Sequence, residues 1–488
     1  MKKKELHSED QFSDQAGEQL TWATKLNYGV GAMGKSLSNQ ITVKTRFFYE
    51  NVLHLHLGFL SVLYFLGRIW DGVNDLLMGT VIDNTRGKYG KFRPWIVLGA
   101  LTNAVVTVAM FWQPSFRSHT ALLAVWVAFF YVLWDMTYTM VDVGYWAMIP
   151  ALSMEQKQRD QLSMIPRIFA GPASIIGAFS NKIYETIGGG QEPSQMARGI
   201  FTCAIISSGV YILTSLYSAA KVKEPGIDTP KINQEKFSLR KAASILLHND
   251  QALVIVGVMI LFNWANNLTG SGMDNHFFWE LGGPEALTQQ GFFNIITGAG
   301  STIGLFVFPL VSRWFGRKRV YAGSFLVPCL GYLAMALVDR FAPGSFLPLA
   351  VSGLVAYVGY GSMSVMQGVM LADAVDYGEY TTGVRNEGII FSTLTMLSKL
   401  AKAFSDLTGT VIASVTKFGG QHANTATPLA IRGFKMTMYQ IPPLLLLLAL
   451  LLYLRKFRLH PARVEEIQGE LKARKAALAV EIESGTAD

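Results

Sequence analysis

The chain has 488 residues, of which 50% are hydrophobic and only 16% are charged, and its mean hydropathy is +0.29. Soluble proteins carry about 25% charged residues, so charge this scarce argues against an ordinary soluble protein and points to lipid as the solvent. The net charge of +8 does not indicate nucleic-acid binding, because the basic residues lie in short loops between apolar segments. The two cysteines both lie in apolar stretches, which argues against a disulfide framework or a cysteine metal site.

A helix that crosses a membrane needs about 20 predominantly apolar residues. The sequence contains twelve such segments, which predicts an all-α membrane protein of twelve transmembrane helices. Three of them, 25–52, 58–83 and 388–415, carry lysine, arginine or aspartate, so they are expected to face a protein interior or a wet cavity. The segments begin near residues 25, 58, 95, 120, 166, 199, 251, 288, 320, 345, 388 and 433.

The order of these segments predicts two pseudo-symmetric six-helix bundles, because a short basic turn containing glycine follows both the second and the eighth segment. Short loops on one side carry eighteen lysines and arginines and those on the other side four, so both termini are expected in the cytoplasm. The predicted divisions are a cytoplasmic tail at 1–24, a bundle at 25–222, a cytoplasmic linker at 223–250, a second bundle at 251–459 and a cytoplasmic tail at 460–488.

Residues 29–36 read GVGAMGKS, which fits two glycine-rich nucleotide-binding patterns and raises the alternative of a nucleotide-dependent enzyme or pump. Both patterns work only in a loop that leaves a buried strand and opens a helix. Here no apolar strand precedes the motif and a membrane span follows it, so the glycines are interpreted as positions of close helix packing. No HExxH or GxSxG pattern is present, and we expect neither enzymatic activity nor a cofactor.

The second span carries Arg68, Asp71, Asn74 and Asp75 at spacings of three and four residues, which places them on one helical face. Two carboxylates this close in a membrane must share a cation, a proton or an arginine. The simplest alternative is an ion pair, for example of Arg68 with Asp71, that only joins helices. Because each intramembrane acid costs about 2.5–3.5 kcal/mol on insertion, two acids beside the amide oxygen of Asn74 favour a functional site.

The fourth span repeats the pattern, with Asp135, Thr139, Asp142 and Trp146 along one stripe. Thr139 and the polar residues of the second span would supply only oxygen ligands, which suits a hard monovalent cation.

Several motifs occur in an order that is typical of one transporter family. These motifs are RIWDGVND (68–75), GKYGKFRPW (87–95), YTMVD (138–142), PRIFA (166–170) and ADAVDYGEY (372–380). From about Thr24 to Leu459 the chain resembles the glycoside–pentoside–hexuronide:cation symporters of the major facilitator superfamily, and within them the melibiose permeases.

The resemblance implies the major facilitator fold and a role for each of several polar residues. The implied cation site for sodium, lithium or protons consists of Asp71, Asn74, Asp75 and Thr139. The implied sugar contacts are Lys35, Asp142, Trp146 and Arg167, and the implied coupling residues are Arg68 and Lys399.

The chain departs from the melibiose permeases at two sugar-contact positions, where it has Ser36 in place of an aspartate and Ser364 in place of a tryptophan. It also has additional charges at Lys44, Arg46 and Asp135. One hypothesis is that a lost acid and new bases suit an anionic sugar such as a uronide. The other is a compensating pair of Lys44 with Asp135, which lie at nearly the same depth at a rise of about 1.5 Å per residue.

We therefore expect a secondary symporter that moves a sugar or glycoside into the cell with a monovalent cation by alternating access, without nucleic acid as a partner. An anionic hexuronide is the alternative substrate, and a transporter-like solute receptor is the alternative of another class. The expected location is the bacterial inner membrane, with the chain crossing the lipid bilayer many times.

Overall fold

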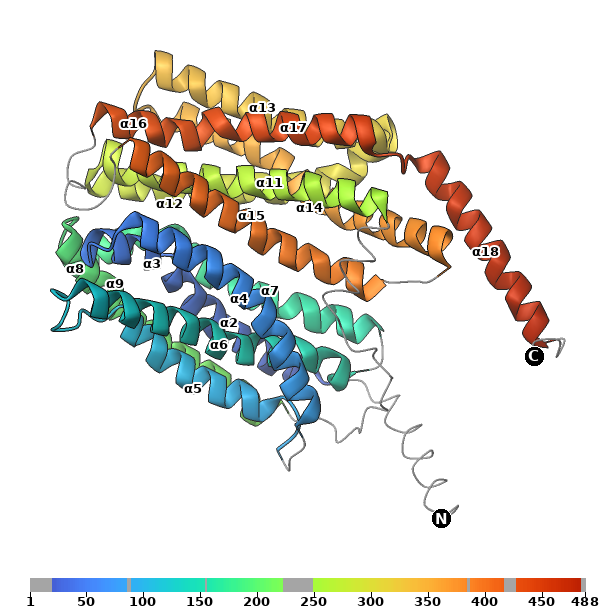
Figure 1. Ribbon diagram of the computed structural model, residues 1–488, viewed down its shortest axis with the longest axis horizontal. Coiled ribbons are helices and arrows are strands. Elements are labelled where there is room, and N and C mark those ends of the chain that lie inside the picture. Colours follow the sequence, from blue (N-terminus) through green and yellow to red (C-terminus); the bar gives the residue numbers. More distant parts are fainter. Residues whose placement is uncertain are drawn as a thin grey trace. The chain divides into compact units, whose positions relative to one another are not determined.

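A computed structural model of the chain describes residues 20–85, 89–153, 156–222, 249–383, 387–416 and 427–483, and these residues are almost entirely helical. They form two compact units, one with the helices up to Lys221 and one with the helices from Asp250 onward (Figure 1). We call them unit 1 and unit 2. The predicted tail and linker boundaries stay predictions, because residues 1–19 and 223–248 lie outside the described part of the chain.

Unit 1 consists of the helices that match the first six predicted spans. They are α2 (Trp22–Thr42), α3 (Thr45–Phe47), the π-helical η1 (Phe48–Val52), α4 (Leu57–Asn84), α5 (Arg93–Met110), α6 (Thr120–Leu152), α7 (Gln156–Ala178), α8 (Ser180–Gly188) and α9 (Pro193–Lys221). The first span begins at a cap in which the Thr21 side chain accepts a hydrogen bond from the Thr24 amide, and the sixth begins at a capping box of Glu192 and Gln195.

Unit 2 matches the other six predicted spans and ends with one more helix. Its elements are α11 (Asp250–Asn275), the π-helical η2 (His276–Leu281), α12 (Gly283–Phe315), α13 (Arg317–Phe341), α14 (Phe346–Thr382), α15 (Glu387–Val415), α16 (Pro428–Lys435), the π-helical η4 (Met436–Gln440), α17 (Ile441–Lys456) and α18 (Pro461–Glu483). The predicted all-α fold is confirmed, whereas the side of the membrane on which the termini lie stays a prediction.

Within the described residues, eight helices are long and apolar enough to cross a membrane, and the bent pair of α7 and α8 makes a ninth. The helices α2, α4 and α15 are not among them. These are the three spans whose charged residues the sequence sets apart from the others. Their helices therefore depend on protein neighbours or water for polar groups that lipid cannot solvate.

The fifth span differs from its prediction, because α7 begins at Gln156 and not near residue 166. The polar residues before 166 continue the same helix, and a hydropathy pattern detects only its apolar part. Pro166 and Pro172 lie inside α7, and the chain bends by 58° between α7 and α8. Proline removes a backbone hydrogen bond within a helix, which is consistent with a broken span here.

The glycine-rich motif at 29–36 lies in the middle of α2, so the nucleotide-binding interpretation fails for lack of a strand and a loop. A Cβ atom on Gly34 would lie 2.8 Å from the Cα of Tyr211 on α9, and one on Gly29 would lie 2.7 Å from the ring of Phe169 on α7. Real Cβ atoms do not approach other atoms this closely. The glycines therefore allow α2 to pack against both neighbours.

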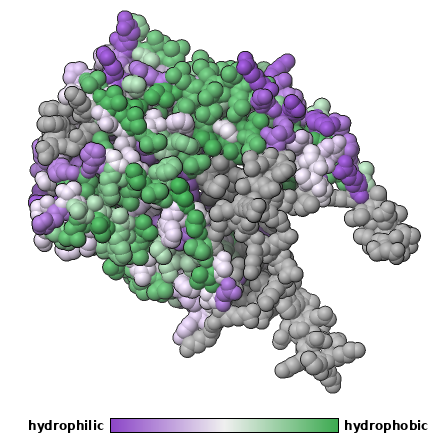
Figure 2. Space-filling view, in the orientation of Figure 1, coloured by the Kyte–Doolittle hydropathy of each residue, from purple (hydrophilic) through white to green (hydrophobic). Residues whose placement is uncertain are grey.

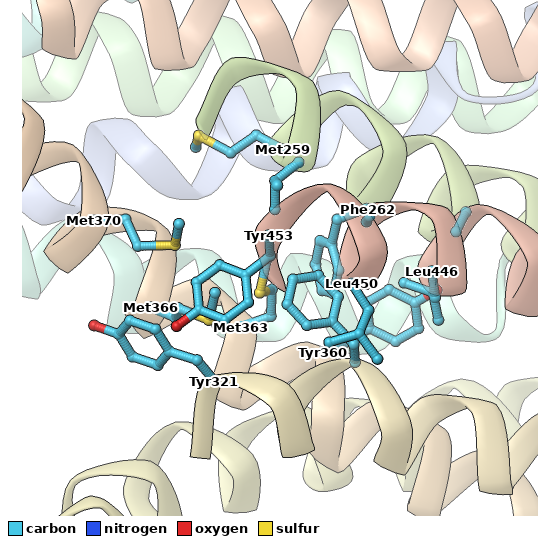
Figure 3. Packing of buried hydrophobic residues seen from close by; sticks show 14 of the residues in the cluster. Met259, Phe262, Tyr321, Tyr360, Met363, Met366, Met370, Leu446, Leu450 and Tyr453 are labelled. Carbon is cyan, nitrogen blue, oxygen red and sulfur yellow. The ribbon is translucent and has the colours of Figure 1, made fainter. Parts of the chain in front are cut away.

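The core of unit 2 is built from aromatic and methionine side chains of α11, α13, α14 and α17 (Figure 3). Phe262, Met363 and Met366 are at most 3% exposed, and Tyr453 of α17 packs against the rings of Tyr321 and Phe325 on α13. Methionine fills irregular gaps because its chain is unbranched and flexible. This packing supports the helices that line the polar pocket of unit 2.

Large apolar side chains also cover the outside of the helices, as the hydrophobic surface in Figure 2 shows. Leu213, Phe306 and Leu347 are 67–70% exposed, which would be costly in water over so wide an area. Lipid is the solvent that such a surface fits. By contrast, α18 in the predicted C-terminal tail has the mixed polarity of a helix outside the membrane. It packs on α14, where Gln468 donates to Asp376 at 2.9 Å and the guanidinium of Arg474 donates to the carbonyl of Tyr380 at 3.1 Å.

Candidate functional site

A reciprocal pair of tyrosines joins α2 to α6 in unit 1. The hydroxyl of Tyr28 donates to the carbonyl of Tyr145 at 2.5 Å, and the hydroxyl of Tyr145 donates to the carbonyl of Tyr28 at 2.6 Å. The two rings stack with centroids 4.3 Å apart, and both side chains are buried. The pair fixes the register of the helices, with Lys35 two turns farther along α2 and Asp142 one turn earlier on α6.

Lys35 and Asp142 form a short ion pair, with Nζ donating to Oδ1 at 2.6 Å. The lysine side chain is 6% exposed and the aspartate side chain is 39% exposed. The Lys35 ammonium also lies 4.8 Å from the ring centroids of Tyr145 and Trp146. The ammonium is thus held from three sides, while Asp142 and Trp146 each keep more than a third of their surface exposed.

A second set of contacts joins α4 to α6. The hydroxyl of Thr139 donates to Oδ1 of Asp75 at 3.3 Å, and the amide nitrogen of Asn74 donates to Oδ2 of Asp135 at 3.4 Å. Both distances exceed those of strong side-chain hydrogen bonds, so the contacts orient the groups without binding them tightly. Thr139 is 2% exposed and Asn74 is 5% exposed, so both lie in the interior of unit 1.

The remaining acid of α4, Asp71, is 8% exposed and lies 3.8 Å from the guanidinium of Arg68 on the same helix. This is the ion pair that the sequence offers as the alternative to a cation site. At 3.8 Å it is a loose pair, because charge-assisted hydrogen bonds of arginine are about 2.7–2.9 Å long.

The two sets of contacts meet on α6, where Thr139 and Asp142 are three residues apart and so face the same side. The contacts between α4 and α6 bring together the carboxylates of Asp75 and Asp135, the side-chain amide of Asn74 and the hydroxyl of Thr139. The contacts between α2 and α6 place the carboxylate of Asp142 and the indole of Trp146 around Lys35. Within the described residues, no group of three or more His, Cys, Asp or Glu side chains is placed to hold a metal ion.

The family model described as "MFS/sugar transport protein" matches residues 27–460. The chain belongs to this family. The match covers both units, including all the helices of the site in unit 1.

Two curated relatives agree with this assignment, and one solved structure shares the fold. This sugar transporter is 26% identical over 440 residues to a lactose permease of Leuconostoc lactis, covering 87% of this chain and 66% of that protein, so it spans about two thirds of the permease. It is 26% identical over 409 residues to the inner membrane symporter YicJ of Escherichia coli, covering 83% of this chain and 85% of YicJ. The structure of a D-xylose-proton symporter has the same fold, with a TM-score of 0.57 and 13% sequence identity. The match covers 89% of this chain and 97% of that chain.

The structure of the transporter brings together most of the predicted residues of unit 1. Lys35 contacts Asp142 and Trp146, and Asp75 contacts Thr139. Arg167 lies on α7 with an exposed side chain, and among the described residues no hydrogen bond or ion pair joins it to Asp142. The roles of all these residues in cation and sugar binding stay predictions.

The additional charges lie near the end of the first span and in α6. Lys44 follows the end of α2 as the N-cap of α3, and Arg46 pairs with Glu50 at 3.5 Å. Asp135 accepts its hydrogen bond from Asn74, a contact that the sequence does not predict. The predicted pairing of Lys44 with Asp135 stays a prediction.

Of the other predicted residues, one lies beside Lys35 and two lie in unit 2. Ser36 is a half-buried residue of α2 next to Lys35. Ser364 and Lys399 belong to unit 2, on α14 and α15 respectively. Ser364 is exposed, and its hydroxyl donates to the carbonyl of Gly361 at 2.7 Å.

Sequence reasoning missed a polar pocket in unit 2 to which Ser364 contributes. Its amide side chains come from α11, α12 and α14, namely Asn263, Asn266, Asn294 and Gln367. The available signal was the repetition of asparagine in the seventh span, at positions 263, 266 and 267. In a long apolar helix, neutral amides are a weaker signal of a polar site than charged residues are. These asparagines therefore did not stand out in the sequence.

Proposed function

We propose that this sugar transporter is a symporter that carries a glycoside into the cell together with sodium, lithium or a proton, by alternating access. The observation that carries the proposal is that α6 belongs to both sets of contacts in unit 1. Thr139 contacts an acid of α4, and Asp142 on the next turn contacts Lys35 of α2. A ligand at either set therefore acts on the same rigid helix, which provides a physical route for coupling.

In this proposal Asp71, Asn74, Asp75 and Thr139 bind the cation, while Asp142, Trp146, Lys35 and Arg167 bind the sugar. Arg68 holds Asp71 when the cation is absent, and Lys399 assists coupling. Cation binding near the acids removes their mutual repulsion and fixes α4 against α6. The ordered α6 then presents Asp142 and Trp146 to the sugar, so the cation raises sugar affinity.

The energy for uphill transport comes from the cation. Inward movement of one positive charge across a potential of 100 mV supplies about 2.3 kcal/mol. At about 1.4 kcal/mol for each tenfold, the potential alone supports an accumulation of roughly fifty-fold. The proposal needs no cofactor and no enzymatic step. Location in a bacterial inner membrane fits it, since the relative YicJ is an inner membrane symporter.

The test is the variant Asp75→Cys in proteoliposomes, with labelled lactose and matched glucosides and glucuronides as solutes. Loss of the carboxylate removes a cation ligand, so accumulation driven by an imposed sodium or lithium gradient is expected to vanish. The control variant Asp250→Cys changes an aspartate at the start of α11 in unit 2 and is expected to accumulate solute as the parent does. If Asp75→Cys still concentrates solute under a sodium gradient, the cation assignment is wrong.

Counterflow in the same vesicles separates a transporter from a receptor. With no ion gradient, a transporter exchanges internal unlabelled solute for external labelled solute, whereas a receptor binds solute without exchange. A parent chain that binds a sugar but shows no counterflow would contradict the proposed symport.

A further inference from the structure

The first and the seventh predicted spans end in a related five-residue sequence. Residues 46–50 read RFFYE and residues 276–280 read HFFWE, so in both a basic side chain precedes a glutamate by four positions. Both segments run into a π-helical turn, η1 in unit 1 and η2 in unit 2. Such turns are rare and are frequently found at functional sites. The two segments hold equivalent places, because each follows the first long helix of its unit.

In both segments the basic side chain reaches the glutamate. Nε of Arg46 lies 3.5 Å from Oε2 of Glu50, and Nδ1 of His276 lies 2.6 Å from Oε2 of Glu280. The side chains of Glu50 and His276 are only 6% and 7% exposed, so water solvates them poorly. The two pairs differ in chemistry, because arginine is always charged, whereas histidine gains or loses its charge between about pH 5 and pH 8.

Glu280 belongs to a larger charged network in unit 2. Its second oxygen, Oε1, lies 3.5 Å from the Lys435 ammonium of α16, and that ammonium lies 2.6 Å from Oδ1 of Asp339 on α13. The hydroxyl of Tyr439 on η4 donates to Oδ2 of Asp339 at 2.8 Å. The network therefore joins η2 to α13, α16 and η4.

The charges of this network balance only when His276 carries a proton. Glu280 and Asp339 contribute two negative charges, and Lys435 contributes one positive charge. A neutral imidazole leaves one negative charge in excess, and an imidazolium removes that excess. The four side chains are 7–23% exposed, so an unbalanced charge among them is poorly solvated and costly.

The other charged side chains on the helices around η2 do not supply the missing positive charge. Asp274 on α11 is a further acid, and the hydrogen bond that it accepts from Gln290 of α12 comes from an uncharged amide. Glu285 on α12 and Arg432 on α16 are exposed, so water and salt screen their charges. A proton on His276 is the simplest way to balance the network.

We propose that His276 and Glu280 form a proton-binding site in unit 2, at which a proton taken from solvent by the imidazole holds η2 against α16. The imidazolium donates to Glu280 in a charge-assisted hydrogen bond. When the proton leaves, Glu280 and Asp339 share the single ammonium of Lys435, and the contacts of η2 loosen. The site is separate from the candidate cation site, which lies in unit 1, and it does not depend on the proposed symport.

Two substitutions of His276 fix the charge of the network in opposite states. His276→Arg carries a permanent positive charge, as Arg46 does in unit 1, and therefore imitates the protonated chain. His276→Gln keeps a hydrogen-bond donor for Glu280 without a charge, and therefore imitates the deprotonated chain. His119→Gln is the matched control, because His119 is an exposed histidine at the start of α6 in unit 1.

The measurement is the melting temperature of the purified full chain in detergent, from about pH 5.5 to about pH 8.5, the range in which histidine changes its charge. Unfolding disperses the network, so the stabilisation by the bound proton is present at low pH and is lost as the pH rises. The parent should melt together with His276→Arg at the acid end. At the alkaline end it should melt together with His276→Gln, about 2–4 °C below His276→Arg. The control His119→Gln should follow the parent throughout.

The converse variant Arg46→His keeps the test decisive if substitutions of His276 impair folding. It gives unit 1 the histidine–glutamate pair of unit 2, so the chain should show an additional fall in melting temperature as the pH rises. A constant difference between the parent and His276→Arg at all pH values would overturn the proposal. Absence of any added pH dependence in Arg46→His would overturn it as well. Because melting is measured without sugar or an ion gradient, neither result bears on symport.

Discussion

The candidate site of unit 1 and the polar pocket of unit 2 place polar groups inside a helical unit in different ways. In unit 1 the polar residues are charged and held by ion pairs, with Lys35 against Asp142 and Arg68 against Asp71. The polar residues that line the pocket of unit 2 are neutral amides and hydroxyls, and they lie beside the packed rings of Phe262 and Tyr360. Burying a charge in the hydrocarbon region costs more free energy than burying a neutral polar group, so intramembrane charges usually mark functional sites. Neutral polar groups can recognise the shape and the hydroxyl pattern of a ligand.

The contrast suggests a division of labour between the units. In the proposed symport, the charges of unit 1 would respond to a cation, because its arrival changes the balance of every nearby pair. The neutral side chains of the pocket in unit 2 would change little with the ion. Variants that remove a charge should therefore have larger effects than variants that remove a neutral hydrogen bond.

The largest effect is expected for Lys35→Met, which leaves Asp142 without its partner at 2.6 Å and removes the cation beside Trp146. Substrate affinity should fall at least 100-fold, or about 2.7 kcal/mol, in a binding assay with sodium. Because Asp142 is 39% exposed, water screens the orphaned carboxylate, and stability should fall by less than the 3–5 kcal/mol typical of a fully buried pair.

The double variant Lys35→Met with Asp142→Asn separates folding from binding. It has no unpaired charge, so its melting temperature should return to that of the parent while affinity stays low. Wild-type affinity in the single variant would show that the pair is only structural.

The spans and the acids of unit 1 were predictable because hydropathy and helical spacing are local properties of the sequence. Intramembrane charges stand out in an apolar segment, so the spacing of Asp71 and Asp75 singled them out, whereas Lys35 was named from the family resemblance. Their partners were harder to predict. The contact of Asn74 with Asp135 depends on the register of α4 against α6, and that register is fixed by packing between residues far apart in the chain.

The pocket of unit 2 was missed for a related reason. Asn263 and Gln367 lie more than one hundred positions apart, and each alone resembles an ordinary polar residue in a long helix. They line one pocket only because α11, α12 and α14 approach each other closely, and no periodicity in the sequence predicts that approach. The start of α7 was misplaced because hydropathy does not detect a helix that continues beyond the lipid.

A smaller effect is expected for Asp135→Asn, which tests whether the additional acid of unit 1 belongs to the cation set. Its contact with Asn74 is long at 3.4 Å, so its influence on the cation is expected to be indirect. The sodium concentration that gives half-maximal sugar binding should rise three- to tenfold, without the complete loss expected for Asp75→Cys. A complete loss would place Asp135 among the direct ligands, and no change would remove it from the site.

The smallest effect is expected for Tyr360→Phe in unit 2, which removes a neutral hydroxyl from the chain that runs through Tyr332 to Thr269. A single neutral hydrogen bond contributes about 0.5–1.5 kcal/mol, so the free energy of unfolding in detergent should fall by about that amount. The ring and its aromatic contacts remain, so sodium-dependent sugar binding should change less than threefold. The control is Tyr211→Phe in unit 1, whose buried hydroxyl has no hydrogen-bond partner among the described residues, so its removal should cost nothing. Equal losses in the free energy of unfolding of the two variants would mean that the hydroxyl hydrogen bonds of unit 2 give no specific support to the pocket. The contrast between charged and neutral networks would then be supported by unit 1 alone.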